Sequence, residues 1–93
     1  MIPYEVRKAV YDDAIAHYGR ESQIMMAVEE MAELTKELAK AFRPAGTTRE
    51  QIMDEVADVT IMMEQLRLIF DMNEEVQGRI DYKVQRLAQR IGA

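Results

Sequence analysis

The chain has no cysteine and no tryptophan, and it has one histidine and only two prolines among its 93 residues. Without cysteine, disulfides, thiolate catalysis and cysteine-based zinc sites are all excluded. Because His17 is the only histidine, a multi-histidine metal site cannot form within one chain. No apolar run approaches the roughly 18–20 residues that a membrane span needs, and the N-terminus lacks a signal-peptide pattern. We therefore expect no membrane association and a cytoplasmic location.

Positive charge is in the minority. Twelve Lys and Arg residues face seventeen Asp and Glu residues, which gives a net charge of −5. A balance of this sign argues against general affinity for nucleic-acid phosphates and permits cation binding. We therefore expect no stable complex with nucleic acid.

Apolar residues recur at steps of three and four along most of the chain, which is the spacing of amphipathic helices. Capping and stop residues divide this pattern into four helical segments, at about residues 3–18, 22–43, 47–70 and 73–91. Thr47 and Thr48 each have Glu or Gln three residues later, as in a capping box. No strand pattern, linker or repeat is present. The sequence predicts one all-α domain over residues 1–93, an antiparallel four-helix bundle.

The segment from Ile52 to Phe70 has apolar residues on two sides. One side, which we call the 52–70 seam, is formed by Ile52, Val56, Val59, Met63, Leu66 and Phe70, and the other side by Ala57, Ile61 and Leu68. We expect this helix to be buried almost all round. Because an isolated bundle would leave the second side exposed, the pattern favours a homo-oligomer.

Acidic residues form two pairs with helical spacing. Glu30 and Glu33 lie one turn apart in the second segment, and Glu55 and Asp58 lie one turn apart in the third. Helices joined by a short loop run antiparallel, so the two pairs can meet near the middle of the bundle. Two carboxylates about 5 Å apart repel by roughly 3 kcal/mol at an effective dielectric constant near 20. Such a cluster must splay into water, take up protons or hold cations, and oxygen ligands select Mg²⁺ or Mn²⁺.

A non-catalytic interpretation remains open, because Glu-rich helices commonly carry acidic pairs on a solvated face. In that case the chain is a helical dimerisation module whose acidic face is exposed to solvent. A di-iron carboxylate bundle would need Glu-x-x-His on two helices, and this chain has no such pair.

The last segment carries a basic stripe beside its apolar positions. Its members recur at steps of four, three and four: Arg79, Lys83, Arg86 and Arg90. They either pair with acidic helices or clamp phosphate oxygens, for which Arg offers a forked geometry and Lys a point charge. An acidic cluster together with this basic stripe indicates a metal-bridged polyphosphate ligand.

Taken together, the motifs resemble the signature of the MazG-type all-α nucleoside triphosphate pyrophosphohydrolases. Glu29-Glu30-x-x-Glu33 is followed after 21 residues by Glu55-x-x-Asp58, and Lys83-Val-Gln-Arg86-Leu is similar to the family's Lys-x-x-Arg segment. The similarity runs from about Gln23 to Ile91. It implies Mg²⁺-dependent hydrolysis of nucleoside triphosphates to monophosphate and pyrophosphate, by water attack at the α-phosphorus, in a homodimer or homotetramer.

The resemblance also implies roles for single residues. The metal ligands would be Glu30, Glu33, Glu55 and Asp58. Glu29 would position the water or bind a further metal, and it is our candidate catalytic residue. The substrate phosphates would contact Lys83 and Arg86, with Arg79 of the same stripe beside them. Many relatives have Asn seven residues after the metal-binding Asp, where this chain has Gln65, and the Trp that many carry is missing. The preferred base and sugar are therefore not predicted.

Overall fold

The computed structural model describes residues 1–92, which form four α-helices and, within that range, no strand. The helices are α1 (Tyr4–Tyr18), α2 (Arg20–Lys40), α3 (Arg49–Ile69) and α4 (Asn73–Arg90). The prediction of an all-α fold is confirmed, and each predicted segment matches one helix to within about three residues at either end. Ala93, the last residue of the predicted domain, lies outside the described residues. No helix within residues 1–92 is long and apolar enough to cross a membrane.

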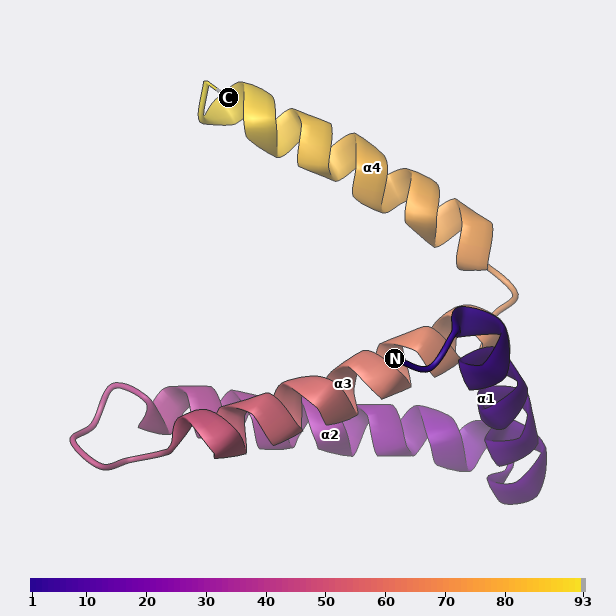
Figure 1. The fold of residues 1–93 in the computed structure, drawn as a ribbon, viewed down its shortest axis with the longest axis horizontal. Coiled ribbons are helices and arrows are strands. Elements are labelled where there is room, and N and C mark those ends of the chain that lie inside the picture. Colours follow the sequence, from indigo (N-terminus) through magenta and orange to yellow (C-terminus); the bar gives the residue numbers. More distant parts are fainter. Residues whose placement is uncertain (93) are drawn as a thin grey trace.

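Helices α2 and α3 form a long antiparallel hairpin, which is the centre of the fold (Figure 1). The hairpin turns through residues 41–48, and α3 begins with the predicted capping box. The Gln51 backbone N–H donates to the Thr48 hydroxyl over 3.2 Å, and the Thr48 backbone N–H donates to the Gln51 side chain over 3.0 Å. These two bonds satisfy donors that the first helical turn leaves free, and so they fix where α3 starts.

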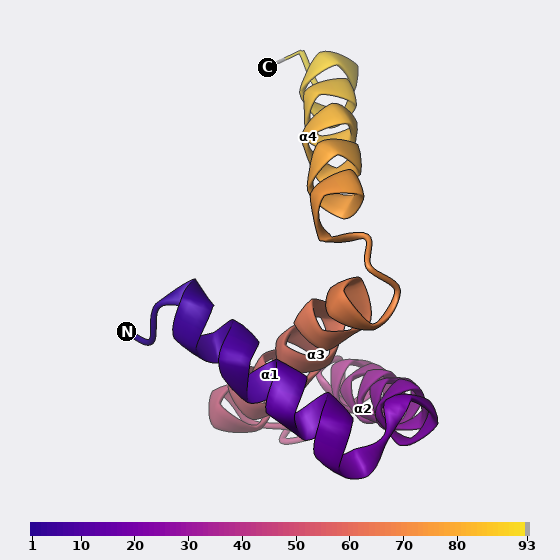
Figure 2. The same ribbon diagram turned by 90° about the vertical axis from the view of Figure 1, so that its right-hand side faces the viewer.

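Helix α1 crosses the open end of the hairpin and contacts both of its helices (Figures 1 and 2). A single residue, Gly19, separates α1 from α2, and its φ of 95° lies in the region that glycine adopts without strain. Tyr11 is the α1 side chain that becomes buried, while Val6, Val10 and Tyr18 stay exposed. The sharp turn at Gly19 therefore turns the side of α1 that carries Tyr11 toward the hairpin.

Helix α4 leaves the other three helices and extends away as an arm (Figures 1 and 2). It starts after a turn in which Asp71 has a φ of 49°, and it contacts only α3. The Arg67 guanidinium of α3 donates to the Asn73 carbonyl oxygen over 3.0 Å and to the Gln77 side chain over 3.3 Å. These bonds hold the first turn of α4, and no residue of α4 is buried. Three helices are therefore packed together, and the predicted fourth member of the bundle is not.

The buried interior is small. Among the described residues it consists of Tyr11, Gln23, Ala27, Met62 and Gln65. The expectation that α3 is buried almost all round is wrong for the single chain, because Val56, Ile61 and Phe70 remain 42–47% exposed. On α2, apolar residues at the same steps of three and four, which we call the α2 seam, are exposed too, at Val28, Met31, Leu38 and Phe42.

The geometry of the hairpin explains this exposure. The residues of α2 that face α3 include Gln23, Ala27 and Glu30, and the apolar seam of α2 is shifted from them by one residue, or about 100°. The 52–70 seam of α3 is shifted in the same sense from its own inward-facing positions. Because the two helices run antiparallel, both shifts turn toward the same side of the hairpin. Both seams therefore lie on one side of the hairpin, which we call the seam face. Its exposed apolar residues are Val28, Met31, Leu38, Phe42, Val56, Met63 and Phe70.

Candidate metal centre

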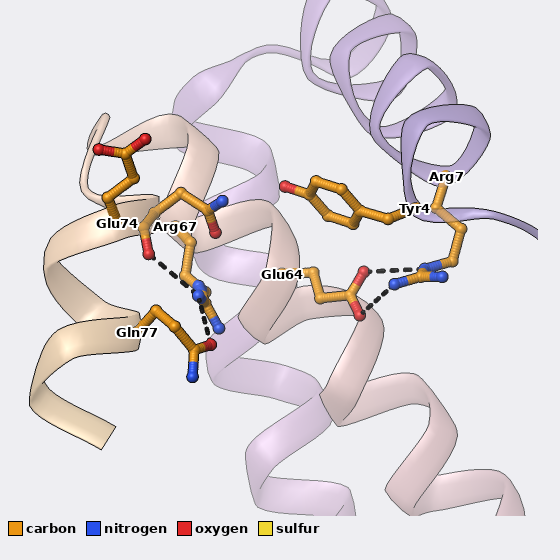
Figure 3. Close-up of a pocket in the computed structure, with 7 residues that line it drawn as sticks. Tyr4, Arg7, Glu64, Arg67, Glu74 and Gln77 are labelled. Carbon is orange, nitrogen blue, oxygen red and sulfur yellow. Dashed lines mark hydrogen bonds and ion pairs between the residues drawn. The ribbon is translucent and has the colours of Figure 1, made fainter. Parts of the chain in front are cut away.

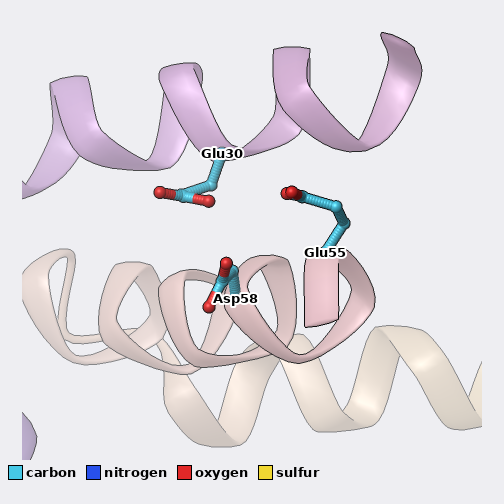
Figure 4. A group of neighbouring side chains, drawn as sticks. All are labelled: Glu30, Glu55 and Asp58. Atoms are coloured by element: carbon cyan, nitrogen blue, oxygen red, sulfur yellow. The ribbon is translucent and has the colours of Figure 1, made fainter. Parts of the chain in front are cut away.

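Three of the four predicted metal ligands converge between α2 and α3. Glu30 of α2 and Glu55 and Asp58 of α3 each offer a carboxylate oxygen, and these oxygens lie within 4.8 Å of one another. Figure 4 shows Glu30 and Asp58 approaching from opposite helices, with Glu55 beside them. We refer to these residues as the acidic triad. Its convergence follows from the antiparallel pairing, since both helices carry their carboxylates on the face turned toward the other helix.

The closeness of the three carboxylates in the triad is electrostatically unfavourable. Partial burial raises the pKa of Glu30, and the negative charges of Asp58 and Glu55 raise it further. The pKa of Glu55 is raised for the same reasons, with partial burial as the largest cause and the negative charge of Asp58 as the next. Neutralisation of these charges, by protons or by a cation, therefore stabilises the arrangement.

The site fits a hard divalent cation. Its donors are carboxylate oxygens only, the ligand type that Mg²⁺ and Mn²⁺ prefer. The Oε2 atom of Glu55 is buried and has no hydrogen-bond partner, so one strong acceptor is left unsatisfied in the triad. A metal–oxygen bond would satisfy it.

The two remaining acidic candidates lie at the edge of the triad. Glu33 is exposed and does not belong to the group of converging oxygens, but its charge contributes to the raised pKa of both Glu30 and Glu55. Glu29 is exposed and has the smallest influence on Glu30 among the neighbouring acids. Glu33 thus adds negative charge near the triad, whereas the predicted catalytic role of Glu29 has no contact in the single chain to support it.

The predicted phosphate-binding residues do not reach the triad within one chain. Lys83, Arg86 and Arg79 lie on the α4 arm, which does not contact α2. The guanidinium groups of Arg79 and Arg86 lie over the Tyr82 ring, 5.0 and 5.8 Å from its centre. None of the ion pairs among residues 1–92 involves these three residues. The acidic and basic halves of the predicted site are therefore separate in the protomer.

Sequence reasoning missed a pocket at the junction of α1, α3 and α4 (Figure 3). There the Arg7 guanidinium donates to both carboxylate oxygens of Glu64, over 3.2 and 3.3 Å. Burial tends to raise the pKa of Glu64, but hydrogen bonds from Tyr11 and Arg7 outweigh it and hold that pKa below its usual value. Glu64 is thus a paired, ionised residue that ties α1 to α3. A charge pair separated by 57 residues has no local sequence signal.

The sequence also gave no sign that Gln23 and Gln65 are buried. The side-chain amide of Gln23 donates to Oε1 of Gln65 over 2.8 Å, between α2 and α3. Gln65, which stands where many MazG-type enzymes have Asn, is 4% exposed. It is therefore engaged within the chain and is not free to contact a base or sugar.

Comparisons with protein families, curated proteins and solved structures found no match to this chain.

The raised pKa values predict how the stability of the metal-free protein depends on pH. A carboxyl whose pKa is higher in the folded chain binds protons more tightly there, so its contribution to stability falls as pH rises above the ordinary value of 4.5. The double variant Glu30→Gln/Glu55→Gln should therefore have a higher melting temperature than the wild type in EDTA. We expect the difference to be larger at pH 7 than at pH 5, as measured by circular dichroism. A difference that is the same at both pH values would contradict this account of the triad.

Proposed function

We propose that the protein is a Mg²⁺-dependent nucleoside triphosphate pyrophosphohydrolase that forms (d)NMP and pyrophosphate. The convergence of Glu30, Glu55 and Asp58 is the observation that carries this proposal. A cation-binding triad of hard oxygen donors suits chemistry at a polyphosphate, since Mg²⁺ is bound in such sites by a few carboxylates together with substrate phosphates. The order and spacing of the acidic motifs, which resemble those of the MazG-type enzymes, support the choice of substrate.

Each group has a role in the proposed reaction. Glu30, Glu55 and Asp58 would hold the metal, with Glu33 completing the set of ligands. When bound, Mg²⁺ would supply charge neutralisation for the triphosphate and a more acidic water for attack at the α-phosphorus. Glu29 would accept a hydrogen bond from the attacking water and orient it. Lys83 and Arg86 would bind the phosphates that leave as pyrophosphate, and Arg79 would extend this basic surface.

We propose further that the active form is a homodimer or homotetramer, because a single chain exposes too much surface. The 10.8 kDa chain exposes 7218 Å², whereas a compact monomer of this mass exposes about 5,500 Å². Its radius of gyration is 15.8 Å, against about 12 Å for a compact domain of this length. The excess of about 1,700 Å² is roughly twice the area that one partner contributes to a standard interface.

A second copy is the partner that fits the seam face. The face is mostly apolar, with Thr35 between Met31 and Leu38, and it repeats identically on another chain, as a two-fold interface requires. The second chain also brings a second α4 arm, whose stripe of Arg79, Lys83, Arg86 and Arg90 is opposite in charge to the acidic triad. We therefore propose that Lys83 and Arg86 serve the triad of the partner chain, since α4 does not approach α2 in its own.

The alternative is a non-catalytic helical dimerisation module, and the exposed seam face favours it to the same degree as an oligomeric enzyme. The two proposals differ in the role of the acidic triad. The enzyme requires it to bind a metal, whereas an interaction module does not.

The activity is tested by pyrophosphate release from a panel of normal and modified nucleoside triphosphates, with and without Mg²⁺. Glu55→Gln and Asp58→Asn should each reduce turnover by at least about a hundredfold while the helical content is unchanged, because each removes a metal ligand. Glu50→Gln, in the exposed first turn of α3, is the matched control and should retain activity. Mg²⁺ should raise the melting temperature of the wild type and of Glu50→Gln more than that of Glu55→Gln. Full activity in Glu55→Gln or Asp58→Asn would refute the proposed function.

The seam face is tested by introducing a charge at its centre. Met63→Glu should convert the oligomer to a monomer or unfold it, because a carboxylate would be buried in an apolar interface. Met53→Glu is the control, since Met53 is also an exposed methionine of α3 but does not belong to the 52–70 seam. Analytical ultracentrifugation would measure the mass of each variant. An unchanged mass for Met63→Glu would show that the interface lies elsewhere.

The contribution of α4 across the interface is tested by complementation. Asp58→Asn has an intact arm, and Lys83→Ala/Arg86→Ala has an intact triad, so neither homo-oligomer contains a complete site. If the arm serves the partner chain, unfolding and refolding the two variants together should restore activity at the mixed sites. A mixture of Asp58→Asn with Glu55→Gln should stay inactive, because both changes lie in the triad. If the first mixture shows no recovery, the arm acts within its own chain.

A further inference from the structure

The hydrogen bond between Gln23 and Gln65 is the one side-chain hydrogen bond between α2 and α3 in which both partners are buried. Gln23 is 7% exposed and Gln65 is 4% exposed, and the Gln65 amide also approaches the Met62 sulfur at 3.8 Å. Two glutamines facing one another inside a narrow hairpin do little for its stability. Replacing such a pair by apolar residues of the same shape is often neutral or stabilising. The pair therefore calls for a reason other than stability.

The position of the pair relative to the triad suggests that reason. Gln23 lies seven residues before Glu30 on α2, and Gln65 lies seven residues after Asp58 on α3. Seven residues are two helical turns, or about 10.5 Å along the helix axis. In an antiparallel hairpin, the contact that joins Gln23 to Gln65 therefore sets Glu30 opposite Asp58. By the same count, Glu33 lies opposite Glu55.

The residues between the pair and the triad do not fix this alignment by themselves. Ala27 and Met62 fill the layer between them, and they are 1% and 5% exposed. A small residue and an unbranched, adaptable one allow α2 to slide against α3 with little loss of packing. The carboxylates of the triad repel one another, so they favour a slip. A slip of one turn, about 5.4 Å, would separate Glu30 from Asp58 and leave both glutamines without partners.

We propose that Gln23 and Gln65 are a pair of positioning residues that fix the register of α2 against α3 and so hold the acidic triad together for its divalent cation. A single buried polar residue is known to specify register in coiled coils at some cost in stability. Here the same device would oppose the repulsion within the triad. The purpose that we assign to the triad, which is cation binding, rests on the proposed function. The role of the glutamine pair in setting the register of α2 against α3 does not depend on the proposed function.

The test compares the wild type with Gln23→Met/Gln65→Met, which keeps the unbranched shape and removes the hydrogen bond. The matched control is Arg7→Met/Glu64→Met, which removes the hydrogen-bonded pair between α1 and α3 and leaves the α2–α3 register alone. Because the chain has no cysteine, spin labels can be attached uniquely at Lys36→Cys and Met53→Cys in every background. Dilution of labelled with unlabelled chains confines the measured distance to one hairpin. Mn²⁺ affinity is measured by titration in parallel.

We expect the methionine pair to retain the helical content and the melting temperature, to weaken Mn²⁺ binding by at least about tenfold, and to shift or broaden the label distance. The control should change neither the affinity nor the distance. If the double variant fails to fold, Gln65→Asn takes its place, because it keeps a polar side chain that is one methylene too short for the hydrogen bond. Weaker Mn²⁺ binding and a shifted or broadened label distance are then expected for Gln65→Asn. A variant with wild-type affinity and an unchanged distance would overturn the pair's role. A wild type that binds no Mn²⁺ would instead overturn the proposed function, and the label distance would still decide the register.

Discussion

The structure depends on how the α2–α3 hairpin holds together carboxylates that repel one another. One carboxylate oxygen from each of Glu30, Glu55 and Asp58 lies within 4.8 Å of the others, and partial burial together with the repulsion between these charges raises the pKa of Glu30 and of Glu55. A small domain is stable by only about 5–15 kcal/mol in total. The hairpin therefore needs contacts that keep its helices aligned, and at its open end the buried hydrogen bond from Gln23 to Gln65 joins α2 to α3.

The sequence predicted the helices and the meeting of the acidic residues well. The helices were predictable because their signals are local: Pro3 and Gly19 bound α1, and Thr48 caps α3. The convergence of Glu30 with Glu55 and Asp58 was predictable because an antiparallel hairpin with a short turn leaves few alignments. In both cases the deciding interactions lie close together in sequence or follow directly from the connection between two helices.

Burial was predicted poorly, because it depends on which face of a helix finds a partner. The 52–70 seam was expected to face the interior of one chain, and Val56 and Phe70 are instead exposed. Gln23 and Gln65 have the composition of surface residues, so nothing in the sequence marked them as buried. The direction of α4 depends on Asp71 and on the bonds from Arg67 to the first turn of α4, which no periodic pattern encodes.

The small interior has a consequence for how the protein reaches its folded state. With five buried residues among those described, a lone protomer gains little from collapse, and α4, which has no buried residue, lacks the packing that stabilises most helices in proteins. If two copies cover the seam face as proposed, folding and association become one bimolecular reaction, and the free energy of unfolding grows with chain concentration. Dilution alone would then dismantle the metal centre, so the amount of protein a cell makes would govern the fraction that is folded and active.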